Sequence, residues 1–303
     1  MISLSRLLKR LMARAIRATC VHTLIAWLLE AKCITIISYH NPDSRTFEKH
    51  LAFLEKHYSF ISMDEVANFL ERRNWGDLPP RPMVLTIDDG NLDNRRLAET
   101  IRKYRIPATI YLTAGVIGTN RRFWWLSDGL TAAESATLKN LPDSERRMLL
   151  EKKFGHTDTR EYENRSALSW DDVKEWINVG GRVGGHSMFH PILTRCSKEK
   201  AIEEITYSKI VIDRALGANV RHFAYPDGSS DEDIACMVRE AGYQTARTTR
   251  PGWVTLKSDP FSLPVMGVTD DADLHKMILQ VTGVWHAIRV WNVARIGRWH
   301  SFR

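Results

Sequence analysis

The sequence lacks a hydrophobic stretch long enough to cross a bilayer, and it lacks closely spaced cysteines. The apolar run at residues 18–29 has about 12 residues, whereas a membrane-spanning helix needs about 20. The four cysteines include no C-x-x-C pair, which argues against a disulfide framework or a thiolate metal site. Low-complexity tracts and internal repeats are also missing. With 44% hydrophobic and 26% charged residues, the chain is expected to be globular with a substantial core.

Acidic residues are absent from both ends of the chain, where positive charge gathers. The formal net charge is +7, and residues 1–17 carry five arginines and lysines while residues 284–303 carry four arginines. The part between the two ends is close to neutral and has no basic stripe with interleaved aromatics, the usual feature of nucleic-acid-binding proteins. We therefore expect no nucleic-acid partner.

The first 17 residues have the pattern of a basic amphipathic helix, with apolar residues three and four positions apart and arginines opposite them. Such a helix either lies on an anionic membrane surface or packs on its own domain. No small-residue cleavage pattern follows the apolar run, which disfavours a signal peptide. We expect residues 1–32 to form a separate helical segment and the protein to lie in the cytoplasm at the inner face of the membrane. The alternative is an envelope location through an uncleaved N-terminal anchor.

Short apolar segments alternate with capped helical stretches through the rest of the chain. The seven strand candidates are residues 34–39, 83–87, 108–113, 182–184, 221–224, 245–249 and 263–268. Capping boxes beginning at Ser62 and Ser169 mark two of the helix starts. This alternation predicts an α/β fold, a distorted (β/α)7-type barrel of parallel strands with outer helices. We expect the barrel to span residues 33–283 and to be followed by a basic, tryptophan-rich tail at 284–303.

One stretch, residues 118–165, has no strand signal and begins with Phe123-Trp124-Trp125. It is expected to be a helical insertion in the barrel. Two interpretations remain open, a peripheral helical excursion packed by its aromatics or a lid over the active site.

Two adjacent carboxylates, Asp88 and Asp89, follow an apolar strand and precede Gly90. Successive side chains on a strand point in opposite directions, but a turn at the glycine would let both face the mouth of the barrel. Carboxylates held that close need a cation, or one of them stays protonated. The alternative is a solvated Asp-Asp-Gly turn.

Two histidines, His186 and His190, follow the strand candidate at 182–184 with a four-residue spacing. On one helical turn this spacing would put both imidazoles on the same side, as divalent-metal sites require. Together with one of the two carboxylates they would leave coordination positions open, which is typical of a catalytic site. The remaining carboxylate would then be available as a base for hydrolysis.

Three motifs in this order resemble those of the polysaccharide deacetylase family, whose members carry the NodB homology domain. Residues 86–90, T-I-D-D-G, resemble the family's T-F-D-D-G; residues 186–191, H-S-M-F-H-P, fit H-S/T-x-x-H-P; and residues 223–228, F-A-Y-P-D-G, are similar to F-A-Y-P-x-G. The resemblance covers roughly residues 34–282.

The resemblance implies a role for each matched residue. Asp88 would be the catalytic base, and Asp89, His186 and His190 would be ligands of a divalent metal ion. The backbone N–H of Tyr225 would help to stabilise the oxyanion. Zinc is the first expectation for such ligands, and cobalt, nickel or manganese would bind a similar site.

The chain departs from the family at two positions. The arginine that orients the base in many members is absent from the third motif, where Arg221 is the nearest arginine, and the C-terminal leucine-histidine motif of the general acid is not evident. His40 ends the first strand candidate, where it could reach the barrel mouth and act as the acid, and His275 lies on an expected helix. Either histidine could instead be structural, so the general acid stays unassigned.

The resemblance implies a metal-dependent hydrolase that removes an N-acetyl or similar acyl group from a sugar. The basic ends favour a lipid-linked or polymeric saccharide of the bacterial envelope as the substrate, with peripheral contact to an anionic membrane. Two alternatives stay open. One is hydrolysis of a non-sugar amide or imide on the same fold, and the other is a catalytically silent glycan-binding protein.

Overall fold

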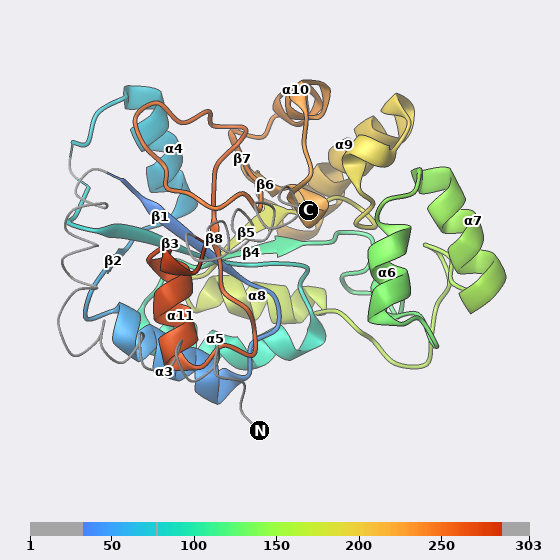
Figure 1. Cartoon of the computed structure of the whole chain (residues 1–303), viewed down its shortest axis with the longest axis horizontal. Coiled ribbons are helices and arrows are strands. Elements are labelled where there is room, and N and C mark those ends of the chain that lie inside the picture. The colour runs from blue at the N-terminus through green and yellow to red at the C-terminus, as the bar shows by residue number, and fades with distance from the viewer. Residues whose placement is uncertain (1–32, 77, 287–303) are drawn as a thin grey trace, which may run out of the picture.

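The computed structural model describes residues 33–76 and 78–286 (Figure 1). The N-terminal segment 1–32 and most of the tail 284–303 lie outside the described residues, so the expectations of an amphipathic helix and of membrane contact stay predictions. In the described ranges, no helix has the length and apolar character needed to cross a membrane.

The centre of the fold is a curled sheet of parallel strands, in the order β7-β6-β5-β4-β3-β1-β8. All seven expected strands are present. They are β1 (Thr35–Tyr39), β3 (Pro82–Ile87), β4 (Thr109–Leu112), β5 (Arg182–Gly185), β6 (His222–Ala224), β7 (Thr245–Arg247) and β8 (Met266–Gly267). The sequence did not predict β2 (Ser59–Phe60), which has only two residues and pairs with the start of β3.

The two edges of the sheet meet through the segment that contains β8. Leu263 forms a parallel bridge with Arg247 at the end of β7, and Val268 donates its backbone N–H to the carbonyl oxygen of Ser38 of β1 at 2.9 Å. The segment 263–268 therefore bonds to both edges, although only two of its residues form a regular strand. This arrangement confirms the expected distorted (β/α)7-type barrel.

Helices surround the strands, with α3, α5, α8 and α11 on one side in Figure 1 and α4, α9 and α10 on the other. Their bounds are α3 (Ser44–Leu54), α4 (Met63–Arg72), α5 (Ala98–Tyr104), α8 (Trp170–Asn178), α9 (Lys198–Leu216), α10 (Glu232–Glu240) and α11 (Leu274–Val281). Short 3-10 helices are η1 (Leu92–Leu97), η3 (Leu193–Arg195) and η4 (Pro226–Gly228). Both expected capping boxes form, at Ser62 and at Ser169. In each, the serine side chain accepts the backbone N–H of the acidic residue three positions later, and the carboxylate of that residue accepts the backbone N–H of the serine.

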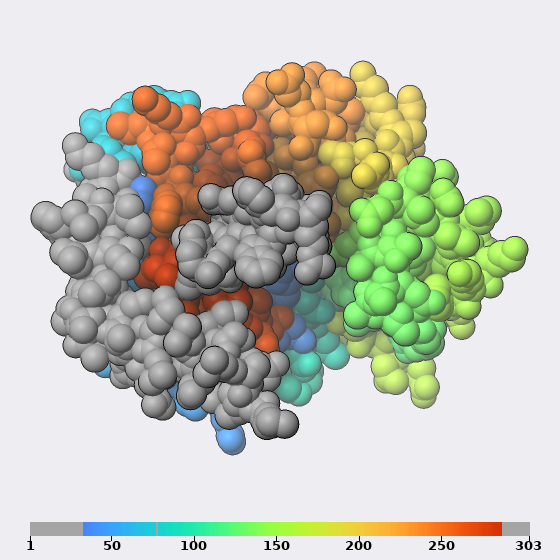
Figure 2. Space-filling view, viewed as in Figure 1, coloured from blue at the N-terminus to red at the C-terminus, as the bar shows by residue number. Residues whose placement is uncertain are grey.

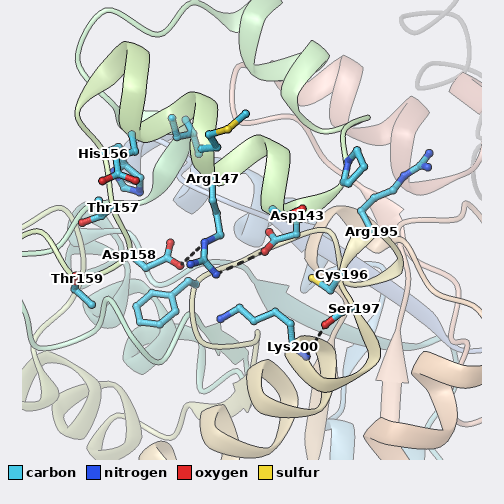
Figure 3. A pocket seen from close by; sticks show the side chains of 16 residues that line it. Asp143, Arg147, His156, Thr157, Asp158, Thr159, Arg195, Cys196, Ser197 and Lys200 are labelled. Carbon is cyan, nitrogen blue, oxygen red and sulfur yellow. Dashed lines mark hydrogen bonds and ion pairs between the residues drawn. The ribbon is translucent and has the colours of Figure 1, made fainter.

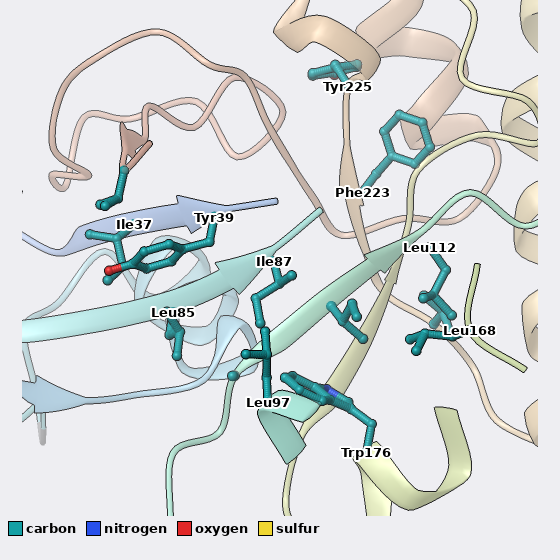
Figure 4. Close-up of a cluster of buried hydrophobic side chains, with 14 of the residues drawn as sticks. Ile37, Tyr39, Leu85, Ile87, Leu97, Leu112, Leu168, Trp176, Phe223 and Tyr225 are labelled. Carbon is teal, nitrogen blue, oxygen red and sulfur yellow. The ribbon is translucent and has the colours of Figure 1, made fainter. Parts of the chain in front are cut away.

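The main core lies between the strands and these helices (Figure 4). Ile37 of β1 and Leu85 and Ile87 of β3 are fully buried, and Trp176 of α8 packs in the same cluster. Burying one such aliphatic side chain is worth about 1.5–3 kcal/mol. This packing fixes the positions of the strands and therefore of the residues at their ends.

The insertion is helical, as the sequence predicted. It contains η2 (Trp124–Leu126), α6 (Ala132–Leu138) and α7 (Asp143–Phe154), and it forms a lobe beside α9 in the space-filling view (Figures 1 and 2). Trp124, Leu138 and Leu150 form a small apolar cluster separate from the main core. The indole N–H of Trp124 donates to the carbonyl oxygen of His190 at 3.0 Å, which ties the insertion to the loop after β5.

Candidate active site

A pocket of about 440 Å³ lies where the carboxyl ends of five parallel strands meet the insertion. The first part of its lining, which we call the strand-end wall, consists of His40, Asp88, Asp89, His186, His190, Tyr225, Asp227 and Thr249. The second part, the insertion wall, consists of Trp125, Ser135 and Lys139. The structure thus brings together all six residues that the sequence singled out. This is the end of a barrel at which loops build active sites.

A sharp turn after β3 directs both carboxylates into this pocket. Asp89 and Gly90 both have positive φ angles, 72° and 79°, which is the left-handed region that favours glycine. A Cβ at position 90 would lie 2.7 Å from Cδ1 of Ile117, so a larger residue would have to displace that side chain as well as adopt the left-handed backbone. The turn is therefore built into the fold, and Asp88 and Asp89 are 3% and 4% exposed.

The loop that carries the two histidines is not helical, so the expectation of a single helical turn was wrong. Ser187 and His190 adopt left-handed φ angles of 61° and 57°. The buried carboxylate of Glu204 on α9 accepts the backbone N–H groups of Met188 and Phe189 at 2.9 and 2.8 Å. The Glu204 carboxylate thus accepts the two backbone N–H groups that would otherwise need carbonyl acceptors within a helical turn, so the loop does not have to be helical.

Both imidazoles nevertheless face the same carboxylate oxygen. The Nε2 atoms of His186 and His190 lie 3.5 and 3.6 Å from Oδ1 of Asp89. Nδ1 of His186 lies 2.7 Å from the carbonyl oxygen of Ala224, which only accepts hydrogen bonds. Nδ1 therefore carries a proton, and Nε2, which faces the pocket, is the ring nitrogen that could bind a metal ion.

This donor set fits a divalent cation. One ligand atom from each of Asp89, His186 and His190 lies within 4.8 Å of the others. Asp89 Oδ1 is buried and has no hydrogen-bond donor among the described residues. Burial and the neighbouring His186 lower the pKa of His190 well below its ordinary value, which favours the neutral, metal-binding imidazole.

An arginine that the sequence reasoning missed holds the second carboxylate. Arg247, at the end of β7 and 1% exposed, donates from Nη2 to Oδ1 of Asp88. Its guanidinium also lies over the ring of Tyr111, 4.8 Å from the ring centroid. A signal was present, because an arginine in a short strand of small and β-branched residues must find a buried partner. Arg221 lies elsewhere and pairs with Asp64 at 2.7 Å.

His40 lies on the other side of Asp88. Its Nε2 is 3.7 Å from Oδ2 of Asp88, and its side chain is 54% exposed. The backbone of His40 is held on both sides, by Oδ1 of Asp270, which accepts its N–H, and by Nδ2 of Asn94, which donates to its carbonyl oxygen at 2.9 Å. His40 therefore stands at the mouth of the pocket with access to both Asp88 and solvent.

The geometry does not support the role expected for Tyr225. Its backbone N–H donates to the carbonyl oxygen of Arg247 at 3.1 Å, and its hydroxyl donates to the carbonyl oxygen of Phe261 at 2.8 Å. The N–H that the third motif was expected to offer to an oxyanion is thus used between β6 and β7. The neighbouring strand β7 supplies the carbonyl oxygen that accepts this N–H. The sequence of the third motif does not reveal which strand lies next to it.

The insertion wall touches His190, one of the three candidate metal ligands, and closes one side of the pocket. The ring of Trp125 contacts that of His190, with centroids 4.6 Å apart. Lys139 Nζ donates to Oδ1 of Asp227 at 2.5 Å, a bond between α6 and the turn after β6. The insertion is therefore more than a peripheral excursion, since it forms part of the pocket.

A larger hollow of about 820 Å³ lies on the other side of the insertion, between α7 and the start of α9 (Figure 3). Arg147 lies between Asp143 and Asp158 there, at 4.0 and 3.8 Å, and Lys200 pairs with Glu204 at 2.8 Å. These charged groups are paired with one another, and none of the expected site residues lines this hollow. The smaller pocket has the chemistry of a catalytic site.

Comparisons with known proteins agree with this arrangement. The polysaccharide deacetylase family model matches residues 76–246, more than half of the chain. A chitooligosaccharide deacetylase from Bradyrhizobium sp. (strain ANU 289) is 26% identical over 178 residues, which are 57% of this chain and 59% of that relative. The match thus spans less than two thirds of the length of this curated relative.

Two solved structures share the fold. The deacetylase PplD of Streptococcus pyogenes, solved in complex with acetate, has a TM-score of 0.61 at 19% identity and covers 82% of this chain and 98% of its own. IcaB from Ammonifex degensii has a TM-score of 0.61 at 20% identity, with coverage of 83% and 97%. At these identities the likeness supports the barrel and leaves the chemistry to be argued from the residues.

Proposed function

This chain belongs to the polysaccharide deacetylase family, and on that premise we propose that it is a metal-dependent hydrolase that removes an N-acetyl or similar small acyl group from a sugar. The observation that carries the proposal is the convergence of Asp89, His186 and His190 beside the paired Asp88 and Arg247. Three ligands with open positions and one unligated carboxylate are what acyl hydrolysis requires.

The metal would supply electrophilic chemistry. A divalent ion held by Asp89, His186 and His190 would polarise the acyl carbonyl and lower the pKa of water. Two imidazoles and one carboxylate suit zinc first, and cobalt, nickel or manganese could occupy the same donor set.

Asp88 would act as the general base. Arg247 engages Oδ1 of Asp88, while Oδ2 faces His40 at the mouth of the pocket. The guanidinium stabilises the ionised carboxylate in a dry environment and holds it in one orientation. The carboxylate can then take the proton of the attacking water.

His40 would protonate the leaving amine. It is a titratable group with access to solvent, and its Nε2 lies 3.7 Å from Asp88 Oδ2. A proton taken up by Asp88 therefore has a short path to the imidazole. His40 would then be the general acid, the role that the C-terminal leucine-histidine motif has in other members of the family.

A saccharide of the envelope, lipid-linked or polymeric, is the proposed substrate class. The relative named a chitooligosaccharide deacetylase supports a sugar substrate, and the basic residues 1–17 support a site of action at the membrane face. The missing arginine of the third motif favoured the alternative of a catalytically silent glycan-binding protein. Arg247 pairs with Asp88 in its place, which weakens that alternative.

The test is release of acetate from free and lipid-linked N-acetyl oligosaccharides by the full chain loaded with zinc. Asp88→Asn is expected to bind metal and lose activity, whereas His186→Ala is expected to lose both. Release from a non-sugar amide but from no saccharide would favour the alternative of amide hydrolysis. Stoichiometric metal with no release from any acyl compound would overturn the proposed function.

A further inference from the structure

Three residues of the pocket come from the insertion and have no role in the proposed acyl hydrolysis. These are Trp125, Ser135 and Lys139, the insertion wall. They line the same pocket as Asp88 and the candidate metal ligands, so the part of a substrate beyond its acyl group would lie within reach of them. Their chemistry therefore bears on what is attached to that acyl group.

Trp125 is a half-buried indole with a fixed orientation. It stacks on Phe123, with centroids 4.9 Å apart and planes 19° apart, and its ring meets that of His190 at an interplanar angle of 64°. Its neighbour Trp124 is buried and bonded to the carbonyl oxygen of His190, which anchors the turn that both tryptophans share. A rigid aromatic surface of this kind offers a large contact area without a large loss of side-chain entropy.

Lys139 and Asp227 supply a hydrogen-bond donor and an acceptor at the same pocket. Their side chains are 38% and 40% exposed, and they bond to each other at 2.5 Å. An exposed ion pair contributes little to stability, so a ligand that offers its own polar groups can replace the bond at small cost. Asp227 is also placed by its backbone, with a φ angle of 57° in the turn before Gly228.

A pyranose ring matches this combination of groups. It has an apolar C–H face that fits an aromatic surface, and its edge carries hydroxyls that both donate and accept hydrogen bonds. Pockets of this type combine apolar contact with a few fixed polar groups that set orientation. A purely apolar amide would use Trp125 but would gain nothing from Lys139 and Asp227.

We propose that the insertion wall, with Asp227, is the sugar-binding part of the pocket, in which Trp125 stacks on the pyranose ring and the Lys139–Asp227 pair binds its hydroxyls. The inference rests on the proposed function and names the residues that select its substrate. Lys139 and Asp227 are 88 positions apart in the chain, so the sugar would join the insertion to the barrel.

The test compares two acetyl compounds, an N-acetylglucosamine oligomer and the non-sugar ester 4-nitrophenyl acetate. For Trp125→Ala in the zinc-loaded full chain, the ratio of kcat/KM for the oligomer to kcat/KM for the ester is expected to fall about tenfold, which is about 1.4 kcal/mol. Trp125→Phe should restore part of the ratio. Leu126→Ala is the matched control, because Leu126 is on the same turn, is 45% exposed and is not part of the pocket lining.

The polar pair is tested with Lys139→Met and Asp227→Asn. Each is expected to raise KM for the oligomer several-fold with a smaller change in kcat. A loss in Lys139→Met that is confined to anionic sugars would overturn the assignment to hydroxyls. An equal fall for oligomer and ester in Trp125→Ala, together with loss of zinc, would overturn the stacking role and make Trp125 a support for His190 alone.

Failure of the proposed function gives a different result. If the wild type hydrolyses no saccharide, the function is wrong, and binding still tests the inference. Calorimetry with the oligomer on zinc-loaded Asp88→Asn and on Asp88→Asn/Trp125→Ala should show binding weakened about tenfold by the second substitution. Equal binding in both, or none, would overturn the inference.

Discussion

The strand-end wall is built from residues at the ends of five parallel strands, whereas the insertion wall comes from η2, from α6 and from Lys139 directly after α6. In the strand-end wall, Asp88 and Asp89 are almost fully buried. In the insertion wall, the side chain of Lys139 is 38% exposed. The two buried carboxylates thus follow a strand that packs in the main core, whereas Trp125, Ser135 and Lys139 stand on the insertion, which has a small apolar cluster of its own.

The largest expected effect comes from Arg247, which holds the base in the strand-end wall. In Arg247→Met, Asp88 keeps a buried charge without its partner, and breaking such a pair costs about 3–5 kcal/mol. We expect kcat to fall about 10²-fold or more, since a positioned base contributes about 10²–10⁴-fold. Urea unfolding and steady-state kinetics measure both effects.

The matched variant is Arg247→Lys, which keeps the charge without the planar donor pair. It should recover part of the stability and part of kcat. If Arg247→Met leaves both quantities near the wild-type values, the guanidinium does not hold the base, and the contrast between the two walls disappears.

A second large effect is expected at Glu204, which holds the loop of the two histidines. Glu204→Leu leaves the partly buried N–H groups of Met188 and Phe189 without their acceptor, at a cost of up to about 1–3 kcal/mol for each group. Because the same loop carries His186 and His190, metal affinity should fall about 10–100-fold, as for other residues that orient ligands. Zinc titration with a competing chelator measures it.

Glu204→Gln is the control for this prediction. Its carbonyl oxygen can still accept both N–H groups, although the ion pair with Lys200 is lost. Zinc affinity close to that of the wild type is therefore expected. Equal losses in Glu204→Gln and Glu204→Leu would show that charge, rather than the two backbone bonds, is what holds the loop.

The smallest effect is expected at the amino end of the strands, away from both walls. Nε2 of His222, the first residue of β6, lies 2.8 Å from Oδ1 of Asp64. The hydrogen bond with His222, aided by the charges of His222 and Arg221, lowers the pKa of Asp64 although partial burial opposes the shift. A carboxyl whose folded pKa is lowered stabilises the protein above its unfolded pKa, and that stability is lost as the pH falls through the folded value.

Asp64→Asn should therefore lower Tm at pH 7, and the difference from the wild type should shrink as the pH falls below about 4, near the ordinary pKa of aspartate. Deacetylation should remain at the wild-type level, because Asp64 does not line the catalytic pocket. Thermal unfolding across pH measures the first effect. A Tm difference that persists unchanged to pH 3 would rule out the ion pair as its cause.

Regular alternation made the barrel predictable from the sequence. Each of the seven strand candidates coincides with an observed strand, because a buried parallel strand needs a run of apolar residues and its ends need turn residues. The strand β2 has two residues and therefore no periodicity to detect. The helical turn expected at His186 and His190 was wrong because Glu204, which follows His190 by 14 positions, satisfies the loop instead.

The sequence by itself determined that its three motifs gather at the pocket, because motifs at the ends of parallel strands converge on one end of a barrel. Only the tertiary structure decided three further points: that Arg247 pairs with Asp88, that the N–H of Tyr225 is taken by the neighbouring strand, and that the insertion lines the pocket. Each depends on contacts between segments far apart in the chain. Such contacts are set by packing, and no local pattern of residues records them.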